Sequence, residues 1–171
     1  SDIDSGLVYD GLDVAEAESQ PDGGLRVVDR GRDLIAFGPR SMEVWADTAA
    51  DAFPFTRQHA TSVGLLAAGA LTKATLMQGN VSDTIVWAAT NAEGAYAGVC
   101  ILQGYSPVKI STYAVDRDFR AVADPSSISA SSYVMDGHGY VRFRLPAVTW
   151  VYDTSTGLWH EETSRDALND E

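Results

Sequence analysis

The feature that most restricts the fold of this chain is a pattern of short strands that recurs along it. Each copy contains a strand, a tight turn, a second strand, a polar or glycine turn and a short third strand. The pattern occurs over residues 32–55, 83–110 and 139–161. Repeats of this kind fold into similar units that follow one another along the chain, because each repeat is one supersecondary element.

Equivalent positions in the repeats give the period. The third-strand positions are 53 and 51 residues apart, and they are Phe55, Val108 and Trp159. The second-strand positions are 54 and 51 residues apart, and they are Trp45, Val99 and Trp150. A period of roughly 40 to 50 residues with several strands per repeat is typical of β-propeller blades. The sequence therefore predicts an all-β fold of three blade-like antiparallel sheets. An irregular β-sandwich with evenly spaced strands is the alternative.

The domain organisation follows from this pattern and from the composition. We expect residues 25–161 to form one β-propeller-type domain of three repeats. Because a closed propeller takes about 4 to 8 blades, three sheets should be part of a larger propeller. The flanking segments 1–24 and 162–171 are acidic and poor in large apolar residues, so we expect both to be loosely ordered.

The clearest single strand lies near the C-terminal end. Val141, Phe143 and Leu145 alternate with Arg142 and Arg144, which is the period of two of a half-buried strand. We expect the three apolar residues to be buried and the two arginines to be largely exposed.

Two segments could form helices. Residues 65–77 are rich in alanine, but a glycine and two threonines weaken a helix there, and the segment lies where the first strands of a blade belong. Residues 115–124 place apolar side chains on one side and precede a proline, which favours a helix that ends there. We expect one short helix, inserted between the second and third repeats.

Charge and hydropathy exclude some partners. The chain has 24 acidic and 12 basic residues, a formal net charge of −12. This disfavours tight binding of DNA or RNA, because such affinity comes largely from Lys and Arg neutralising phosphates. No run approaches the roughly 18 apolar residues that cross a bilayer, so we expect no membrane partner.

The sequence contains no recognisable catalytic, metal or cofactor constellation. His59, His138 and His160 are scattered, without another His, Cys or carboxylate at metal-ligand spacing. Cys100 lies in an apolar run, where a buried hydrophobic role is expected. We therefore predict that the chain is not an enzyme and needs no metal or cofactor.

One alternative function stays open. A glycosidase needs two carboxylates facing each other across a sugar. Asp116, Asp118 and Asp124 lie close together in the sequence with Tyr113 nearby. A carbohydrate-binding or carbohydrate-cleaving propeller is therefore the runner-up, although the same residues also suit a solvated helix face and a cap.

The large aromatic side chains lie on the predicted strands. Aromatic pairs across such strands contribute about 0.5 to 1.5 kcal/mol beyond their buried area, so we expect them to form the structural core of the blades. The expected aromatic core comprises Phe37, Trp45, Phe55, Trp87, Phe143, Trp150, Tyr152 and Trp159.

Several segments together resemble one protein family. The segment TWVYDTSTGLWHE (149–161) is similar to the packaged-DNA stabilisation proteins, or tail accessory factors, of short-tailed bacteriophages. Five further segments resemble the same family in the same order: GHGYVRFRLP (137–146), GYSPVKISTYAVD (104–116), TIVWAA (84–89), DAFPFTRQ (51–58) and RDLIAFGPRSMEVW (32–45). Each segment alone is weakly specific, but six collinear segments are more specific.

The resemblance implies a structural virion protein of the tail hub or head-to-tail connector. Such a protein helps to retain packaged DNA and to attach tail components. The implied partners are portal and adaptor proteins, the needle, and a tail fibre or spike, with packaged DNA nearby but not tightly bound. A ring of identical copies is also implied, located in the virion and, during assembly, in the host cytoplasm.

Overall fold

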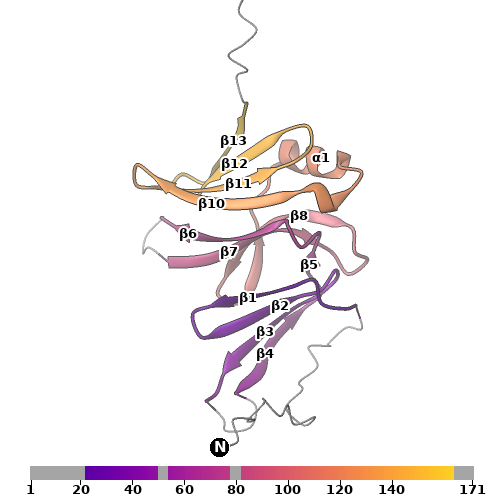
Figure 1. The fold of residues 1–171 in the computed structure, drawn as a ribbon, viewed down its shortest axis with the longest axis vertical. Helices are drawn as coiled ribbons and strands as arrows, with labels where there is room; N and C mark the ends of the chain where they lie inside the picture. The colour runs from indigo at the N-terminus through magenta and orange to yellow at the C-terminus, as the bar shows by residue number, and fades with distance from the viewer. Residues whose placement is uncertain (1–21, 50–53, 78–81, 164–171) are drawn as a thin grey trace, which may run out of the picture.

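A computed structural model describes residues 22–49, 54–77 and 82–163 of the chain. Three antiparallel sheets are stacked face to face along the long axis of the molecule (Figure 1). We call them the first, second and third blades in chain order. Most of the expected acidic segments, 1–24 and 162–171, lies outside the described residues.

The first blade is a meander in which each strand pairs with the next. Two of its turns begin with a glycine. Gly31 directly follows the first strand and has a φ of 63°, which glycine adopts easily, and Gly38 directly follows the second strand. A β-bulge between Val44 and Trp45 shifts the register of the last pair. Its strands are β1 (Arg26–Arg30), β2 (Asp33–Phe37), β3 (Met42–Asp47) and β4 (Phe55–Thr61).

The second blade lies between the other two. Its central strand β7 pairs with β6 and the short β5 on one side and with β8 on the other. The alanine-rich segment 65–77 therefore forms strands, as expected. The strands are β5 (Gly64–Leu65), β6 (Leu71–Leu76), β7 (Ser82–Thr90), β8 (Tyr96–Gln103) and β9 (Ser106–Lys109).

The third blade is again a four-stranded meander. Asp136 and Gly137 join its first two strands, and both have positive φ, as a two-residue type I′ hairpin turn requires. Its strands are β10 (Ser129–Met135), β11 (His138–Arg144), β12 (Thr149–Asp153) and β13 (Leu158–Glu162).

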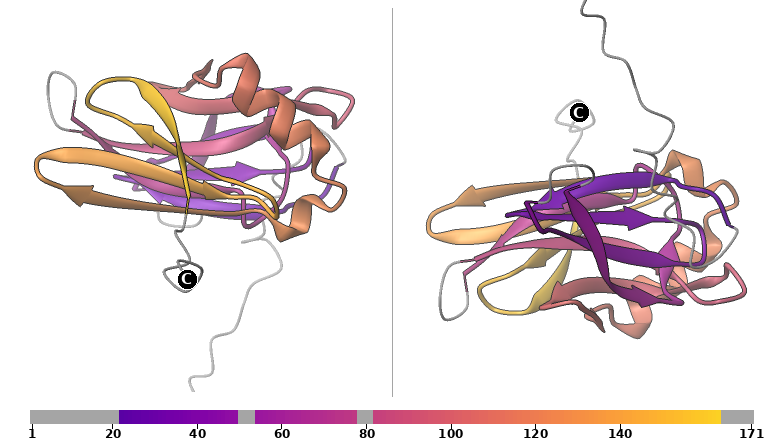
Figure 2. Two further views of the ribbon diagram at one scale, coloured as in Figure 1. Left: turned by 90° about the horizontal axis from the view of Figure 1, so that it is seen from above. Right: turned by 90° about the horizontal axis from the view of Figure 1, so that it is seen from below.

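The helix α1 (Tyr113–Ala121) connects the second and third blades. It was expected between these repeats, but over residues 115–124. It begins two residues earlier and ends three residues earlier, because the chain turns at Val122 into extended backbone. Pro125 then opens a short 3₁₀ helix, Pro125–Ser127, where its missing N–H costs no helical hydrogen bond. Figure 2 shows α1 packed along the side of the stack.

The core consists of two apolar layers, one on each face of the second blade. Ile85, Trp87 and Ala89 of β7 pack towards the first blade, and Val86 and Ala88 pack towards the third blade and α1. All five are buried. Burial on both faces explains why β7 is a continuous apolar run rather than an alternating one.

Each blade has more strands than the sequence pattern indicated. The positions taken as third strands, Phe55, Val108 and Trp159, lie on β4, β9 and β13, which are the last strands of their blades. They lie on three separate sheets, as predicted, but one further strand precedes the first and third patterns and two precede the second. The strand count was therefore wrong. The overlooked strands, β1 and β10, show little apolar alternation because much of each is solvent-exposed. Strands β5 and β6 lie in the segment 65–77, where strands were expected.

The alternation in β11 is confirmed with one difference. Val141, Phe143 and Leu145 are buried and Arg144 is exposed. Arg142 is only partly exposed, because its guanidinium pairs with Glu162 at 2.7 Å and lies over the ring of Tyr133.

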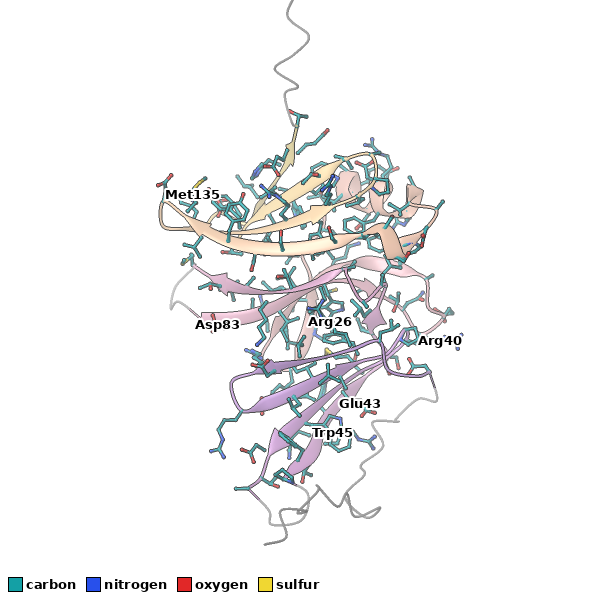
Figure 3. The ribbon with its side chains drawn as sticks, in the orientation of Figure 1. Arg26, Arg40, Glu43, Trp45, Asp83 and Met135 are labelled. Carbon is teal, nitrogen blue, oxygen red and sulfur yellow. The ribbon has the colours of Figure 1, made fainter. Side chains whose placement is uncertain are left out.

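Side-chain hydrogen bonds join neighbouring blades. Arg26 donates to the Ala68 and Leu71 carbonyls of the second blade at 2.8 and 3.0 Å, and Figure 3 shows it between the first two blades. Between the second and third blades, the Thr154 hydroxyl donates to the Thr75 carbonyl at 2.8 Å. The Ser132 hydroxyl also donates to the Lys73 carbonyl across this second junction.

Gly139 lies at the junction of the second and third blades. A Cβ atom here would clash with Thr154 Oγ1 and the Thr75 carbonyl oxygen. We therefore expect Gly139→Ala to lower the free energy of unfolding by about 1 to 3 kcal/mol, the usual cost of overpacking. Urea denaturation measures this change. The control is Ser131→Ala on an exposed part of β10, which should hardly change the free energy of unfolding. Gly137→Ala is not a suitable control, because the positive φ of Gly137 disfavours alanine. Equal stability of Gly139→Ala and the unchanged chain would contradict the close approach.

Candidate functional site

The candidate functional site is the pair of sheet faces at the two ends of the stack. No other described sheet packs on these faces (Figure 1). The third-blade outward face carries Tyr133, His138, Tyr140, Arg142, Arg144 and His160, which share one side by strand register. The first-blade outward face carries Val27, Leu34, Ala36, Glu43, Trp45 and Arg57 by the same criterion.

The third-blade outward face is an aromatic and basic surface. Tyr140 stacks on Tyr133 with ring centroids 5.1 Å apart and on His138 at 6.0 Å, and it meets the edge of His160 at 6.3 Å. Neighbouring large side chains are exposed, including Leu158 at 66% and Met135 at 53%. Such a face is suited to contact with another protein surface.

A hollow of about 590 Å³ lies on this face at the turn between β11 and β12. Arg142, Arg144 and Thr149 line it together with Glu162. Arg142 is paired with Glu162, but Arg144 has no ion pair among the described residues. Glu161 also lines the hollow, so its wall carries both basic and acidic side chains.

A second hollow, of about 270 Å³, lies on the first-blade outward face at the turn between β2 and β3. Asp22 and Glu43 line it, together with Val27 and Ala36. Asp22 accepts hydrogen bonds from the Arg40 backbone N–H at 2.7 Å and from a serine hydroxyl. Within the described part of the chain, its carboxylate has no cationic partner.

Glu43 is a buried carboxylate on this first-blade outward face. Its carboxylate accepts hydrogen bonds from Trp45 Nε1 at 3.0 Å and from Arg57 at 3.2 Å. Figure 3 shows Trp45 on the side of the first blade that lies away from the second. The ion pair with Arg57 compensates the buried negative charge of Glu43. Buried charges are generally paired in this way.

A second buried carboxylate, Asp116, holds α1 against the second blade. It accepts from Tyr96 Oη at 2.9 Å and from Lys109 Nζ at 2.6 Å. Burial raises its pKa, but hydrogen bonds from Lys109, Ser111 and Tyr96 and the charge of Lys109 lower it further than burial raises it, so the pKa lies below its usual value. Asp116 therefore has a structural role in the described fold.

His138 and Asp153 form a third polar pair, which closes the turn between β12 and β13. Their Nδ1 and Oδ2 atoms are 2.8 Å apart, and the Asp153 carboxylate also accepts from the backbone N–H of Ser155 at 2.7 Å. Burial raises the pKa of Asp153, but hydrogen bonds from His138, Ser155 and Thr156 lower it to about 2.

The lowered pKa of Asp153 predicts that its carboxylate stabilises the folded chain at neutral pH and that this stabilisation is lost in acid. Because the folded pKa is depressed, the contribution is fully present above the unfolded value of 3.8 and is lost as the pH falls towards about 2. The difference corresponds to about 2 kcal/mol at neutral pH. We expect Asp153→Asn to lower the free energy of unfolding by about this amount at pH 7. Near pH 2, the free energies of unfolding of the variant and the unchanged chain should be equal. Chemical denaturation across this pH range measures both, and a pH-independent difference would contradict the assignment.

The remaining features of the described chain are its possible metal ligands, its cysteine and its helices. No group of three or more His, Cys, Asp or Glu that could hold a metal occurs within residues 22–49, 54–77 and 82–163. Cys100 is buried, as expected, and burial raises its pKa to about 11. No helix in the described ranges is both long enough and apolar enough to cross a membrane.

The carboxylates considered for carbohydrate cleavage are also held by the fold. Asp118 accepts from Arg117 at 2.8 Å and from Trp150 Nε1 at 3.2 Å. Asp124 caps the 3₁₀ helix by accepting from the Ser126 backbone N–H. Together with Asp116, each therefore has a hydrogen-bonding partner in the described structure, and Tyr113 is exposed at 81% beside them.

The expected aromatic core residues fall into three groups. Phe37 and Trp87 are buried between the first two blades, with ring centroids 5.2 Å apart. Trp45 and Phe55 are half-buried on the first-blade outward face. The others lie on the inward side of the third blade, where an aromatic chain continues through Phe119 to Tyr96: Phe143, Trp150, Tyr152 and Trp159.

The sequence analysis did not identify the outward faces as a site. It treated Arg142 and Arg144 only as the solvent side of a strand, and it did not single out Tyr133 or Tyr140. Their shared position could have been found from the alternation in β11 combined with the Asp-Gly turn before it, which sets the register of β10.

Stacked antiparallel sheets of four, five and four strands, joined in chain order, define the chain as a β-propeller-type protein. Residues 1–164 match the phage-stabilisation family described as "Bacteriophage P22 Gp10, beta-propeller", and the chain belongs to this family. It is accordingly a bacteriophage structural protein. Among curated proteins, no match to the chain is found.

Proposed function

We propose that this protein is a tail-hub or head-to-tail connector component of a phage virion that helps to retain packaged DNA and to attach tail components. The observation that carries the proposal is the family match over residues 1–164. The stacked blades support it, because such sheets form a rigid scaffold with large faces for other proteins. We further propose that residues 25–161 act as one structural domain, and that the eight aromatic residues serve its packing.

The proposal includes portal, adaptor, needle and fibre or spike proteins as neighbours, in the virion and in the host cytoplasm during assembly. Packaged DNA would lie nearby without tight binding, because the chain carries a formal net charge of −12. A reaction is not part of the proposed function. The carboxylates that could cleave a sugar are engaged in hydrogen bonds within the fold, which favours the structural role over the carbohydrate-directed alternative.

Loss of the protein from the phage that encodes it tests this function. We expect a nonsense mutant to package DNA into heads and then lose it, and to lack attached tail components. Nuclease-protected DNA per particle and electron microscopy measure the two effects, and expression of the unchanged protein in the host is the control for complementation. Mutant particles with stably retained DNA and complete tails would refute the proposal.

A further inference from the structure

The hairpin turn between β10 and β11 joins an aspartate directly to a glycine. The turn consists of Asp136 and Gly137, which have φ of 51° and 80° and are both exposed. Met135 and His138 pair on either side of it, so the turn projects from the end of the third blade rather than from one of its faces. Figure 3 shows Met135 at this end of the blade. A sheet packed on either face of the third blade would therefore leave the turn accessible.

The Asp136 carboxylate is not held by the fold. Among the residues that the structure describes, no donor forms a hydrogen bond or an ion pair with it. Gly137 has no side chain to shield the amide nitrogen between the two residues, and a Cβ atom on it would meet no atom within 4 Å. The turn therefore leaves open space in which the carboxyl group of Asp136 can rotate onto the backbone.

We propose that Asp136-Gly137 is a site of spontaneous backbone isomerisation to isoaspartate. The Gly137 amide nitrogen forms a bond to Asp136 Cγ, and the hydroxyl of the protonated carboxyl leaves with the amide hydrogen as water. Water then adds to one of the two carbonyls of the five-membered imide. Opening at Cγ restores aspartate, whereas opening at the main-chain carbonyl leaves the chain running through Cβ and Cγ and produces a free α-carboxylate. The reaction requires no reactant other than water.

A second Asp-Gly pair in the described chain provides an internal comparison. Asp22 is also followed by a glycine of positive φ, and a Cβ atom on Gly23 would likewise meet no atom within 4 Å. The Asp22 carboxylate, however, accepts from the Arg40 backbone N–H at 2.7 Å and from the Ser41 hydroxyl at 3.1 Å. These hydrogen bonds must break before the carboxyl can rotate onto the Gly23 nitrogen. We therefore expect isomerisation at Asp22 to be slower by about fivefold or more, the factor for one hydrogen bond.

Isomerisation at Asp136 would change the geometry of its hairpin. The extra backbone carbon would lengthen a turn whose two residues fix the register of β10 and β11. The first pair beyond the turn includes His138, whose Nδ1 lies 2.8 Å from Asp153 Oδ2, so this end of the third blade should loosen. A structural protein of a phage particle is not replaced by new synthesis, so modified copies would accumulate as the particle ages. This last consequence alone rests on the proposed function.

Ageing of the purified, unchanged chain at neutral pH tests the proposal. An isoaspartate-specific methyltransferase labels the modified residue, and peptide mapping by mass spectrometry locates it. We expect labelling of the peptide that contains Asp136 to rise with time, about fivefold or more faster than labelling of the peptide that contains Asp22. A transient loss of one water from the Asp136 peptide should accompany the rise, because the imide is the intermediate.

Two controls separate the turn from the rest of the chain. Asp136→Glu should abolish labelling at the turn, because glutamate would have to form a less favourable six-membered imide. In urea, where the hydrogen bonds to Asp22 are lost, the two Asp-Gly pairs should be labelled at similar rates.

Equal labelling of the two pairs in the folded chain would overturn the proposal. An Asp136 peptide that is never labelled, or an Asp136→Glu chain labelled as strongly at the turn as the unchanged chain, would also overturn it. Such a failure would leave the proposed virion function intact, because DNA retention is measured separately.

Discussion

Replacing Phe143 with alanine should lower the free energy of unfolding by about 3 to 5 kcal/mol, the range for large aromatic residues removed from a packed core. Phe143 is completely buried on the inward side of the third blade. Its ring meets Phe119 of α1 at 5.6 Å and Trp159 of β13 at 6.3 Å. The substitution would therefore leave a cavity where the helix, the second blade and the third blade meet.

Urea denaturation followed by circular dichroism measures this change. The matched control is Ser131→Ala, which alters an exposed side chain on the neighbouring strand β10 and should change stability by less than about 0.5 kcal/mol. A loss below about 1 kcal/mol for Phe143→Ala would show that β11 does not face a core.

Trp87→Ala should have a similar effect on the other apolar layer, with a loss of about 3 to 5 kcal/mol. Trp87 is fully buried between the first and second blades, where its ring meets the edge of Phe37. Its indole Nε1 donates to the Gly64 carbonyl at 3.1 Å, so the substitution also removes a buried hydrogen bond.

The variant Trp87→Phe separates the two contributions. It keeps much of the aromatic volume but leaves the Gly64 carbonyl without its donor, at a cost of about 1 to 3 kcal/mol. The same denaturation experiment compares both variants with the unchanged chain. If Trp87→Ala cost no more than Trp87→Phe, the packing of the ring on the first blade would not contribute as the structure indicates.

Local patterns predicted those parts of the fold that depend on neighbours in the sequence. The alternation around Phe143 and the spacing of Trp45, Val99 and Trp150 both reflect short-range constraints on strands and reversals. The helix was predicted for the same reason, although its end was misplaced because the chain turns into extended backbone before the proline.

Long-range packing decided the features that the patterns did not predict. β10 shows little alternation, and only its pairing with β11 and its contact with β6 make it a strand of the third blade. Asp116 is held by Lys109 and Tyr96, which come from two strands of the second blade and carry no common motif.

By itself, the sequence determined the period, the all-β class, the turns and the family resemblance, because each of these depends on residues close together in the chain or on collinear segments. Only the tertiary structure decided which face of each blade is covered. Covering depends on the neighbouring blade, because Trp87 is buried between the first and second blades. Arg144 lies instead on a face that no other described sheet covers, and it has no ion pair among the described residues. The two outward faces therefore became recognisable as a candidate site only after the blades were stacked.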